Sequence, residues 1–290
     1  MKFFVTGATG FIGSHFLNAA LAGGHEVVAL RRSRQSASRV PFLSGKEIQL
    51  RWVEGSLDSV RADDLAGIDV LMHLAAGGVT PQPATWESCY RTNVADSLAL
   101  AERAIDAGIS RLVVTGTYAE YGLAGLRFDP IPPDAPLEPT DPYAASKASA
   151  SLALAALCRV RKCELVYYRV FSVFGEGQFE QNFWPQLRRA AMAGEDFPMT
   201  EGDQVRDFLP VSDAAAILLR AASREDVEPG VPCIRNLASG RPVRLRDFAA
   251  ECWAEFGATG QLRPGAIPSR PNEVKRYVPQ VDPIDTLVGR

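Results

Sequence analysis

The stretch VTGATGFIGSH, residues 5–15, decides the fold. Its glycines Gly7, Gly10 and Gly13 stand directly after the apolar segment 2–6 and open a helical segment. The GxxGxxG spacing lets the backbone turn tightly, approach a pyrophosphate closely and pack a helix on a strand, with the helix N-terminus facing the anion. This context predicts a nucleotide-binding loop, and the alternative is a purely structural glycine turn.

Outward from this loop, short apolar segments alternate with amphipathic helical ones, which is the pattern of βαβ units. We expect an α/β protein with a Rossmann-type doubly wound parallel sheet and a smaller C-terminal substrate-binding lobe. The expected strands are 2–6, 26–30, 48–55, 69–75, 111–116 and 164–170, with a further contribution near 232–239, and the expected helices are 14–24, 93–108 and 143–158.

The regular alternation ends after Val170 and gives way to segments rich in aromatic residues, glycine and proline. Irregular segments after a regular sheet carry specificity in doubly wound proteins, because the loops lie at the strand ends. We therefore assign residues 1–170 to a dinucleotide-binding domain with a later return near 205–238. Residues 171–204 and 239–290 are assigned to the substrate-binding lobe.

Composition excludes several classes of partner. The chain has 290 residues and a net charge of −3, which gives no basic field for a nucleic acid. Its longest apolar runs, such as 151–158, are too short to cross a membrane, so we expect no membrane partner and a cytoplasmic location. The five cysteines form no CxxC pair, and we expect inert thiols and no metal site.

The second expected strand ends in paired arginines, in the stretch VVALRRS at 27–33. In a dinucleotide fold this strand end lies beside the adenosine ribose, where an acid would bind both hydroxyls and an arginine would accommodate a 2′-phosphate. No acid follows the strand, so Arg31 and Arg32 favour NADP, with NAD as the alternative. The alternative is that both arginines are solvated on a loop and that the choice of cofactor is made elsewhere. Ser56 and Leu57 are expected to border the adenine.

A tyrosine and a lysine four residues apart begin a later helix, in TDPYAASK. Asp141 is a plausible N-cap with Pro142 in the first turn, and Tyr143 and Lys147 project from one face. A tyrosine with a pKa near 10 needs a nearby cation to form a phenolate. The pair could equally be a surface pair, but the glycine loop and the strand RLVVTGT precede it in an order that could converge on one pocket.

The chain resembles an extended short-chain dehydrogenase/reductase of the NAD(P)-dependent nucleotide-sugar epimerase/dehydratase family. The resemblance rests on TGATGFIG, HLAA at 73–76, Asn93 in TNV, TGTYAEYG at 115–122, PYAASK, YRVFSVFGEG at 168–177, VRDFLPVSD at 205–213, NLASG at 236–240 and RPNE at 270–273. It implies that Thr117 hydrogen-bonds the reacting sugar oxygen, that Tyr143 is the acid/base and that Lys147 holds the nicotinamide ribose.

The same resemblance implies the remaining ligand contacts. For the substrate these are Thr117, Ser172, Asn182, Arg206 and Arg270, although Arg206 could instead pair with Asp207 or Asp213. Ser172 replaces the asparagine of many relatives, which alters a usual contact. For the cofactor the implied residues are Gly7, Thr9, Gly10, Phe11, Ile12, Gly13, Arg31, Arg32, Ser56, Leu57, Leu74, Ala75, Ala76, Asn93, Tyr143 and Lys147.

Several reactions are compatible with this set of residues. Tyr118 and Ala119 follow Thr117 where 4,6-dehydratases have Asp-Glu, so dehydration is disfavoured. His73 is expected to satisfy backbone partners, which disfavours epimerisation beside a ketone. The leading hypothesis is NADPH-dependent reduction of a nucleotide-linked 4-keto-6-deoxy sugar, as in the abequose and related deoxyhexose synthases. The alternatives are a nucleotide-sugar 4-epimerase and a non-catalytic NADP-binding sensor. A homodimer through the helices holding Asn93 and Tyr143 is implied by the family.

Overall fold

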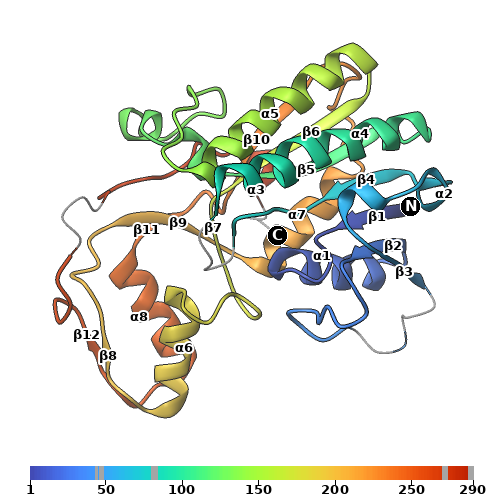
Figure 1. Cartoon of the computed structure of the whole chain (residues 1–290). Helices are drawn as coiled ribbons and strands as arrows, with labels where there is room; N and C mark the ends of the chain where they lie inside the picture. Colours follow the sequence, from blue (N-terminus) through green and yellow to red (C-terminus); the bar gives the residue numbers. More distant parts are fainter. Residues whose placement is uncertain (43–44, 46–48, 80–83, 270–273, 287–290) are drawn as a thin grey trace.

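A parallel sheet of seven strands forms the centre of the molecule in a computed structural model that describes residues 1–42, 45, 49–79, 84–269 and 274–286 (Figure 1). The strand order is β10-β6-β5-β4-β1-β2-β3, and all six neighbouring pairs are parallel. The chain reverses its direction of travel across the sheet between β1 and β4, which places the carboxyl ends of these strands beside a crevice. The strands are β1 (Lys2–Thr6), β2 (Glu26–Arg31), β3 (Leu50–Glu54), β4 (Val70–His73), β5 (Arg111–Thr117), β6 (Glu164–Val170) and β10 (Cys233–Leu237).

Helices cover both faces of this sheet because each buried strand has apolar side chains on both sides. Phe3 and Val5 of β1 belong to one core cluster, whereas Phe4 between them belongs to the other. The helices α1 (Phe11–Ala22) and α7 (Val211–Ala221) pack on the first face, and α2 (Ala62–Leu65), α4 (Ser97–Asp106) and α5 (Pro142–Arg161) cover the second (Figure 1).

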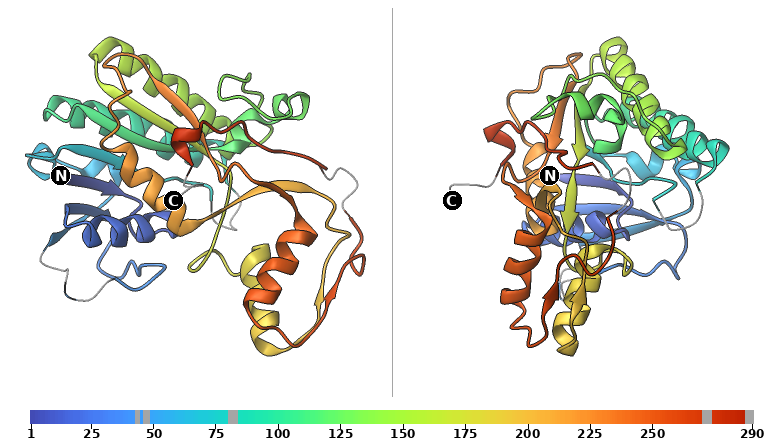
Figure 2. Two further views of the ribbon diagram at one scale, coloured as in Figure 1. Left: turned by 180° about the vertical axis from the view of Figure 1, so that it is seen from behind. Right: turned by 90° about the vertical axis from the view of Figure 1, so that its left-hand side faces the viewer.

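A smaller lobe extends from the carboxyl edge of the sheet and contains a core of its own (Figure 2). Its helices α6 (Phe183–Ala193) and α8 (Leu245–Glu255) lie side by side, and Phe208 stacks on Phe248 at 3.9 Å. A three-stranded sheet links the lobe to the main sheet. The lobe's strands are β7 (Ser172–Phe174), β9 (Val205–Pro210) and β11 (Pro242–Arg244) in the linking sheet, and β8 (Phe197–Pro198) and β12 (Leu262–Arg263) in a two-stranded sheet.

The doubly wound Rossmann-type fold expected from the sequence is confirmed, and the strand segments fall within a few residues of their expected bounds. The segment 205–238 is divided between the two parts: β9 pairs with β7 and β11, whereas α7 packs on α1 and β10 pairs with β6. All five cysteines are buried and free. Within the described residues, the chain has no helix whose length and apolar character suffice to cross a membrane.

Candidate active site

The glycine loop between β1 and α1 forms a cradle in which side chains do not fit. Gly7 has φ +70°, and a Cβ there would lie 2.6 Å from the backbone carbon of Leu74. A Cβ on Gly13 would overlap the carbonyl oxygen of Gly7. Gly10 is the N-cap of the twelve-residue α1 and offers no side-chain cap, so the first amides of the helix are left for an external acceptor.

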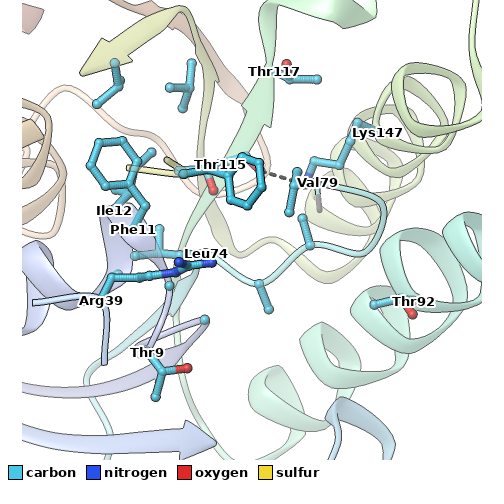
Figure 3. Close-up of a pocket in the computed structure, with 18 of the residues that line it drawn as sticks. Thr9, Phe11, Ile12, Arg39, Leu74, Val79, Thr92, Thr115, Thr117 and Lys147 are labelled. Carbon is cyan, nitrogen blue, oxygen red and sulfur yellow. Dashed lines mark hydrogen bonds between the residues drawn. The ribbon is translucent and has the colours of Figure 1, made fainter. Parts of the chain in front are cut away.

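A cavity of about 670 Å³ runs from this loop along the carboxyl ends of the strands to the foot of α5 (Figure 3). Its wall combines residues that are far apart in the sequence, as expected at the point where strand order reverses. The residues that we predicted and that line it are Gly7, Thr9, Gly10, Phe11, Ile12, Gly13, Arg31, Arg32, Ser56, Leu57, Leu74, Ala75, Ala76, Thr117, Tyr143, Lys147 and Asn182.

Three of these residues, Thr117, Tyr143 and Lys147, meet at one end of the cavity, which we call the catalytic end. Thr117 ends β5, and its hydroxyl lies close enough to Tyr143 to oppose the rise in the pKa of the phenol. Asp141 caps α5 by accepting from the Ala144 amide at 2.9 Å, as predicted, which fixes the first turn that carries Tyr143. One turn later, Lys147 Nζ donates to the Thr115 carbonyl at 2.7 Å (Figure 3).

Burial dominates the electrostatics at the catalytic end. It raises the pKa of Tyr143, and the nearby Glu120 carboxylate raises it further, against the opposing effect of the Thr117 hydroxyl. Burial lowers the pKa of Lys147 to about 8, against the opposing attraction of Glu120. The phenol is therefore protonated in the cofactor-free site at neutral pH, and the lysine titrates close to physiological pH.

His73 and Asn93 stand behind the catalytic end. The His73 ring is held by the hydroxyls of Thr6 at 2.7 Å and Ser97 at 2.9 Å, so its partners are side chains and not the backbone groups we expected. Burial and the charge of Lys147 lower its pKa to about 3, so the ring is neutral. Asn93 is also buried, and its amide bonds both backbone groups of Gly77 and the Ser146 hydroxyl. Asn93 thus orders the loop after β4 from behind the cavity wall.

The opposite end of the cavity, which we call the adenosine end, differs from the sequence interpretation in one respect. We noted no acid beside Arg31, but the β2–β3 register places Glu54 directly opposite it. Arg31 donates to Glu54 at 2.9 Å and lies over the ring of Trp52, and Arg34 donates to the same carboxylate at 3.1 Å. The hydrogen bond from Arg31 lowers the pKa of Glu54. An acid is therefore present, and it is paired with arginines.

A further arginine, missed in the sequence, reaches the cavity from the loop after β2. Arg39 extends its guanidinium into the cavity from the side of Thr9 (Figure 3). Its amide donates to the Thr9 carbonyl at 3.2 Å, and its backbone packs against Gly177. Within the described residues, we find no ion pair of Arg39. Arg31, Arg32 and Arg39 all line the cavity at this end, and of these Arg31 is paired with Glu54.

The predicted substrate residues are less completely assembled. Asn182 lines the cavity, and Ser172 lies between the lining residues Phe171 and Val173. Arg206 on β9 donates to the carbonyls of Val205 and Val274, each at 2.7 Å. The carboxylate of Asp207, one of its two expected ion-pair partners, accepts from the amides of Ser239 and Gly240. Arg270 lies outside the described residues.

Sequence reasoning also missed Glu120, which is fully buried directly behind Thr117. Its Oε1 accepts from the Thr117 amide and the Tyr167 hydroxyl, each at 2.8 Å, and its Oε2 accepts from Arg169 Nε at 2.7 Å. Arg169 is only 3% exposed. The T-x-x-E spacing of Thr117 and Glu120 is a capping-box signal that could have placed the carboxylate on the Thr117 amide. Its burial carries no such signal, because Tyr167 and Arg169 lie on another strand.

Comparison with known proteins places the chain in a family. Residues 3–232 match the NAD dependent epimerase/dehydratase family, which is most of the chain. The chain belongs to this family. The relatives described in the next paragraph are enzymes that act on nucleotide sugars. The chain is likewise an enzyme of the extended short-chain dehydrogenase/reductase type.

Relatives in the NAD dependent epimerase/dehydratase family have different reactions. A UDP-glucose 4-epimerase of Corynebacterium glutamicum is 28% identical and covers 87% of this chain and 79% of its own. A dTDP-6-deoxy-L-talose 4-dehydrogenase (NAD(+)) of Aggregatibacter actinomycetemcomitans is 26% identical and covers 93% and 96%. The structure of MoeE5 in complex with UDP-glucuronic acid and NAD is 29% identical, with a TM-score of 0.77 over 98% of this chain and 91% of that one.

The residues of this chain fit the dinucleotide that the family name implies. The cradle at Gly7 and Gly13 has room for a pyrophosphate where a Cβ would intrude, and the uncapped N-terminus of α1 faces it. The cavity then leads past Leu74 and Ala75 to Lys147, whose ammonium can bind ribose hydroxyls.

Proposed function

We propose that the protein catalyses the NADPH-dependent reduction of a nucleotide-linked 4-keto-6-deoxy sugar. The observation that carries the proposal is the meeting of Thr117, Tyr143 and Lys147 at one end of a cavity whose other end is lined by arginines. The resemblance to a dTDP-6-deoxy-L-talose 4-dehydrogenase supports a C4 carbonyl as the reacting group.

In this reaction Tyr143 is the proton donor. Its hydroxyl gives a proton to the oxygen of the C4 carbonyl, and Thr117 donates a hydrogen bond to the same oxygen. NADPH, when bound, would supply the hydride to C4. Because burial and Glu120 raise the pKa of Tyr143, the phenol carries the proton before the reaction. A reduced nicotinamide ring is uncharged, so it would not lower the pKa of Tyr143.

Lys147 orients the cofactor and stabilises the phenolate that the proton transfer leaves. Its ammonium is held by the Thr115 carbonyl, with two further protons free for the ribose hydroxyls. The cation also makes loss of the Tyr143 proton less costly in a dry site. Asn182 and Arg206 are proposed as contacts for the sugar and the diphosphate, with Ser172 in a modified role and Arg270 as a second arginine.

Selection of NADPH is assigned to the adenosine end. Arg31 is already paired with Glu54, so the phosphate-binding charge comes mainly from Arg32 and Arg39. A guanidinium binds a phosphate with two parallel hydrogen bonds, which a ribose hydroxyl cannot match.

The test is incubation of purified protein with NADPH and a panel of nucleotide 4-keto-6-deoxy sugars, following the absorbance of NADPH at 340 nm and the sugar product by mass spectrometry. Stoichiometric consumption of NADPH with a product two mass units heavier is expected. Tyr143→Phe serves as the control for background reduction. Isomerised product without net consumption of cofactor would contradict the reductase and support an epimerase.

A second candidate is a nucleotide-sugar 4-epimerase with a retained cofactor, favoured by the resemblance to the UDP-glucose 4-epimerase of C. glutamicum. In that case oxidation and reduction alternate at C4, and Tyr143 first removes a proton. The raised pKa of Tyr143 opposes this first step until the positive charge of an oxidised nicotinamide lies beside it. Nucleotide bound to the purified protein, oxidised and not exchanged by dialysis, would favour the epimerase.

We further propose a cytoplasmic homodimer, because NADPH and nucleotide sugars are cytoplasmic metabolites and because the helices beside the site expose apolar side chains. Trp86 and Tyr90 on α3 (Trp86–Tyr90) and Leu152 on α5 are 59%, 37% and 66% exposed, and α3 packs beside α5 (Figure 1). The mass in solution, measured by light scattering for the wild type and Leu152→Glu, tests this: a dimer that dissociates in the variant is expected, and a monomeric wild type would contradict it.

A further inference from the structure

A buried carboxylate connects the three elements that carry the catalytic end. Glu120 follows β5 and accepts from the Thr117 amide, so it fixes the backbone of the residue whose hydroxyl faces Tyr143. The Tyr167 hydroxyl, which donates to Glu120, also lies 3.2 Å from the Lys147 carbonyl on α5. Glu120 thus reaches the backbone of Thr117 directly and that of Lys147 through one tyrosine.

The side chains around Glu120 are closely packed. A Cβ on Gly116 would overlap both Glu120 Oε1 and the Tyr167 hydroxyl, so the residue before Thr117 is glycine where these groups press on the backbone. On the other side, Arg169 donates to Glu120 Oε2 and to the Pro133 carbonyl, each at 2.7 Å, and lies over the Tyr121 ring. Three donors therefore hold the carboxylate, two at Oε1 and one at Oε2.

The charge of Glu120 is essential to this arrangement and not incidental. A carboxylate removed from water is costly unless it is paired and hydrogen-bonded, and Arg169 satisfies that condition. A neutral glutamine would keep the acceptor for Thr117 but would turn an N–H group toward the N–H of Arg169. Among the described residues, we find Glu120 to be the only carboxylate whose attraction contributes to raising the pKa of Lys147.

We propose that Glu120 is a positioning residue for the reaction, which aligns Thr117 with Tyr143 and keeps Lys147 charged while it binds the cofactor. The proposal rests on the proposed function for its catalytic readout, but its electrostatic part can be tested with the cofactor alone. Glu120 is buried and is not one of the residues that line the cavity, so it acts through Thr117, Tyr167 and Lys147.

The pH dependence of cofactor affinity isolates this role. The titratable groups facing Lys147 are His73 on β4, Glu120 after β5, Tyr143 on α5 and Tyr167 on β6. His73 is neutral above its lowered pKa of about 3, and both tyrosines have raised pKa values. Lys147, with a pKa of about 8, is therefore the member of this set that titrates between pH 6 and 9. Affinity for the cofactor should fall as the pH rises through about 8, because the ammonium loses its charge.

The experiment compares the wild type with Glu120→Gln by NADPH fluorescence titration from pH 6 to 9, or with NADH if NADH binds more tightly. In the variant the midpoint of the affinity profile should move to lower pH, since the group that raises the pKa of Lys147 is neutral. With a keto-sugar substrate, kcat should fall about tenfold, within the range that small misplacements of reacting groups produce. Glu120→Asp, which keeps the charge but is one methylene shorter, should restore the midpoint without restoring kcat.

Two controls make the result decisive. Glu138→Gln removes a carboxylate from an exposed ion pair with Arg127 and should change neither readout. Glu120→Gln combined with Arg169→Leu removes the unpaired buried charge, and it supplies a folded protein if the single variant unfolds. An unchanged midpoint in a folded Glu120 variant would overturn the proposal. A wild type that binds NADPH but reduces no keto sugar would refute the proposed function while leaving the midpoint as the test of Glu120.

Discussion

The two ends of the cavity handle charge in opposite ways. At the catalytic end the Glu120–Arg169 pair is withdrawn from solvent, with side chains 0% and 3% exposed. At the adenosine end Arg34 and Glu54 are 82% and 42% exposed, and three arginines line the wall. Buried pairs fix geometry because breaking them leaves a charge without water, whereas exposed charges are screened by salt and adjust to a ligand. The catalytic end is thus built for alignment and the adenosine end for recognition.

The largest effect is expected from removing the proton donor. Tyr143→Phe should lower kcat by about 10²–10⁴-fold, the range for loss of a positioned general acid, with little change in cofactor affinity. Steady-state rates and fluorescence titration of the same preparation measure both. Retention of wild-type kcat would show that the proton comes from elsewhere.

Removing Arg169 from the buried pair with Glu120 should lower the stability of the protein. Arg169→Met leaves the Glu120 carboxylate unpaired and should reduce the free energy of unfolding by about 3–5 kcal/mol. Denaturant unfolding measures the loss, and Arg127→Met, which breaks the exposed pair with Glu138, should cost about 1 kcal/mol or less. Equal losses in the two variants would remove the distinction between buried and exposed pairs.

At the adenosine end, Arg39→Gln should weaken NADPH binding about tenfold, the effect of one charge-assisted hydrogen bond to phosphate, and NADH binding less. The loss should shrink as salt is raised, since the side chain is exposed. Titrations at two salt concentrations provide the comparison. An equal loss for both cofactors would assign Arg39 to the pyrophosphate and not to the 2′-phosphate.

The smallest effect is expected from Glu54→Gln. The substitution releases Arg31 from its ion pair, so the ratio of NADPH to NADH affinity should rise about two- to fivefold, in line with the modest strength of exposed pairs. Unfolding should be nearly unchanged. A fall in the ratio would mean that Glu54 positions Arg31 for the phosphate and does not compete with it.

Local sequence rules predicted the parts of the site whose interacting residues are close together in the chain. The spacing of Gly7, Gly10 and Gly13 defines the loop, and Asp141 and Pro142 define the start of α5. The meeting of Thr117 with Tyr143 and Lys147 was predicted from the order of the strand RLVVTGT and the helix that begins in TDPYAASK.

Contacts between strands were beyond these rules. Arg31 meets Glu54 because of the β2–β3 register, and Glu120 meets Arg169 because β5 lies beside β6. The intervening chain does not encode either pairing as a motif. Arg39 was missed for a related reason: its loop is irregular, and its contacts with Thr9 and Gly177 join segments that are far apart in the sequence.

The loop after β7 bears on how often the cofactor is replaced. Gly177 packs against the backbone of Arg39, and the Glu176 carbonyl is 2.9 Å from the ring of His15, so part of the cavity wall is a seam between the lobe and the sheet domain. A dinucleotide leaving on this side would first have to break these contacts. The stability of these contacts would then influence whether the cofactor is exchanged at each turnover or retained over many.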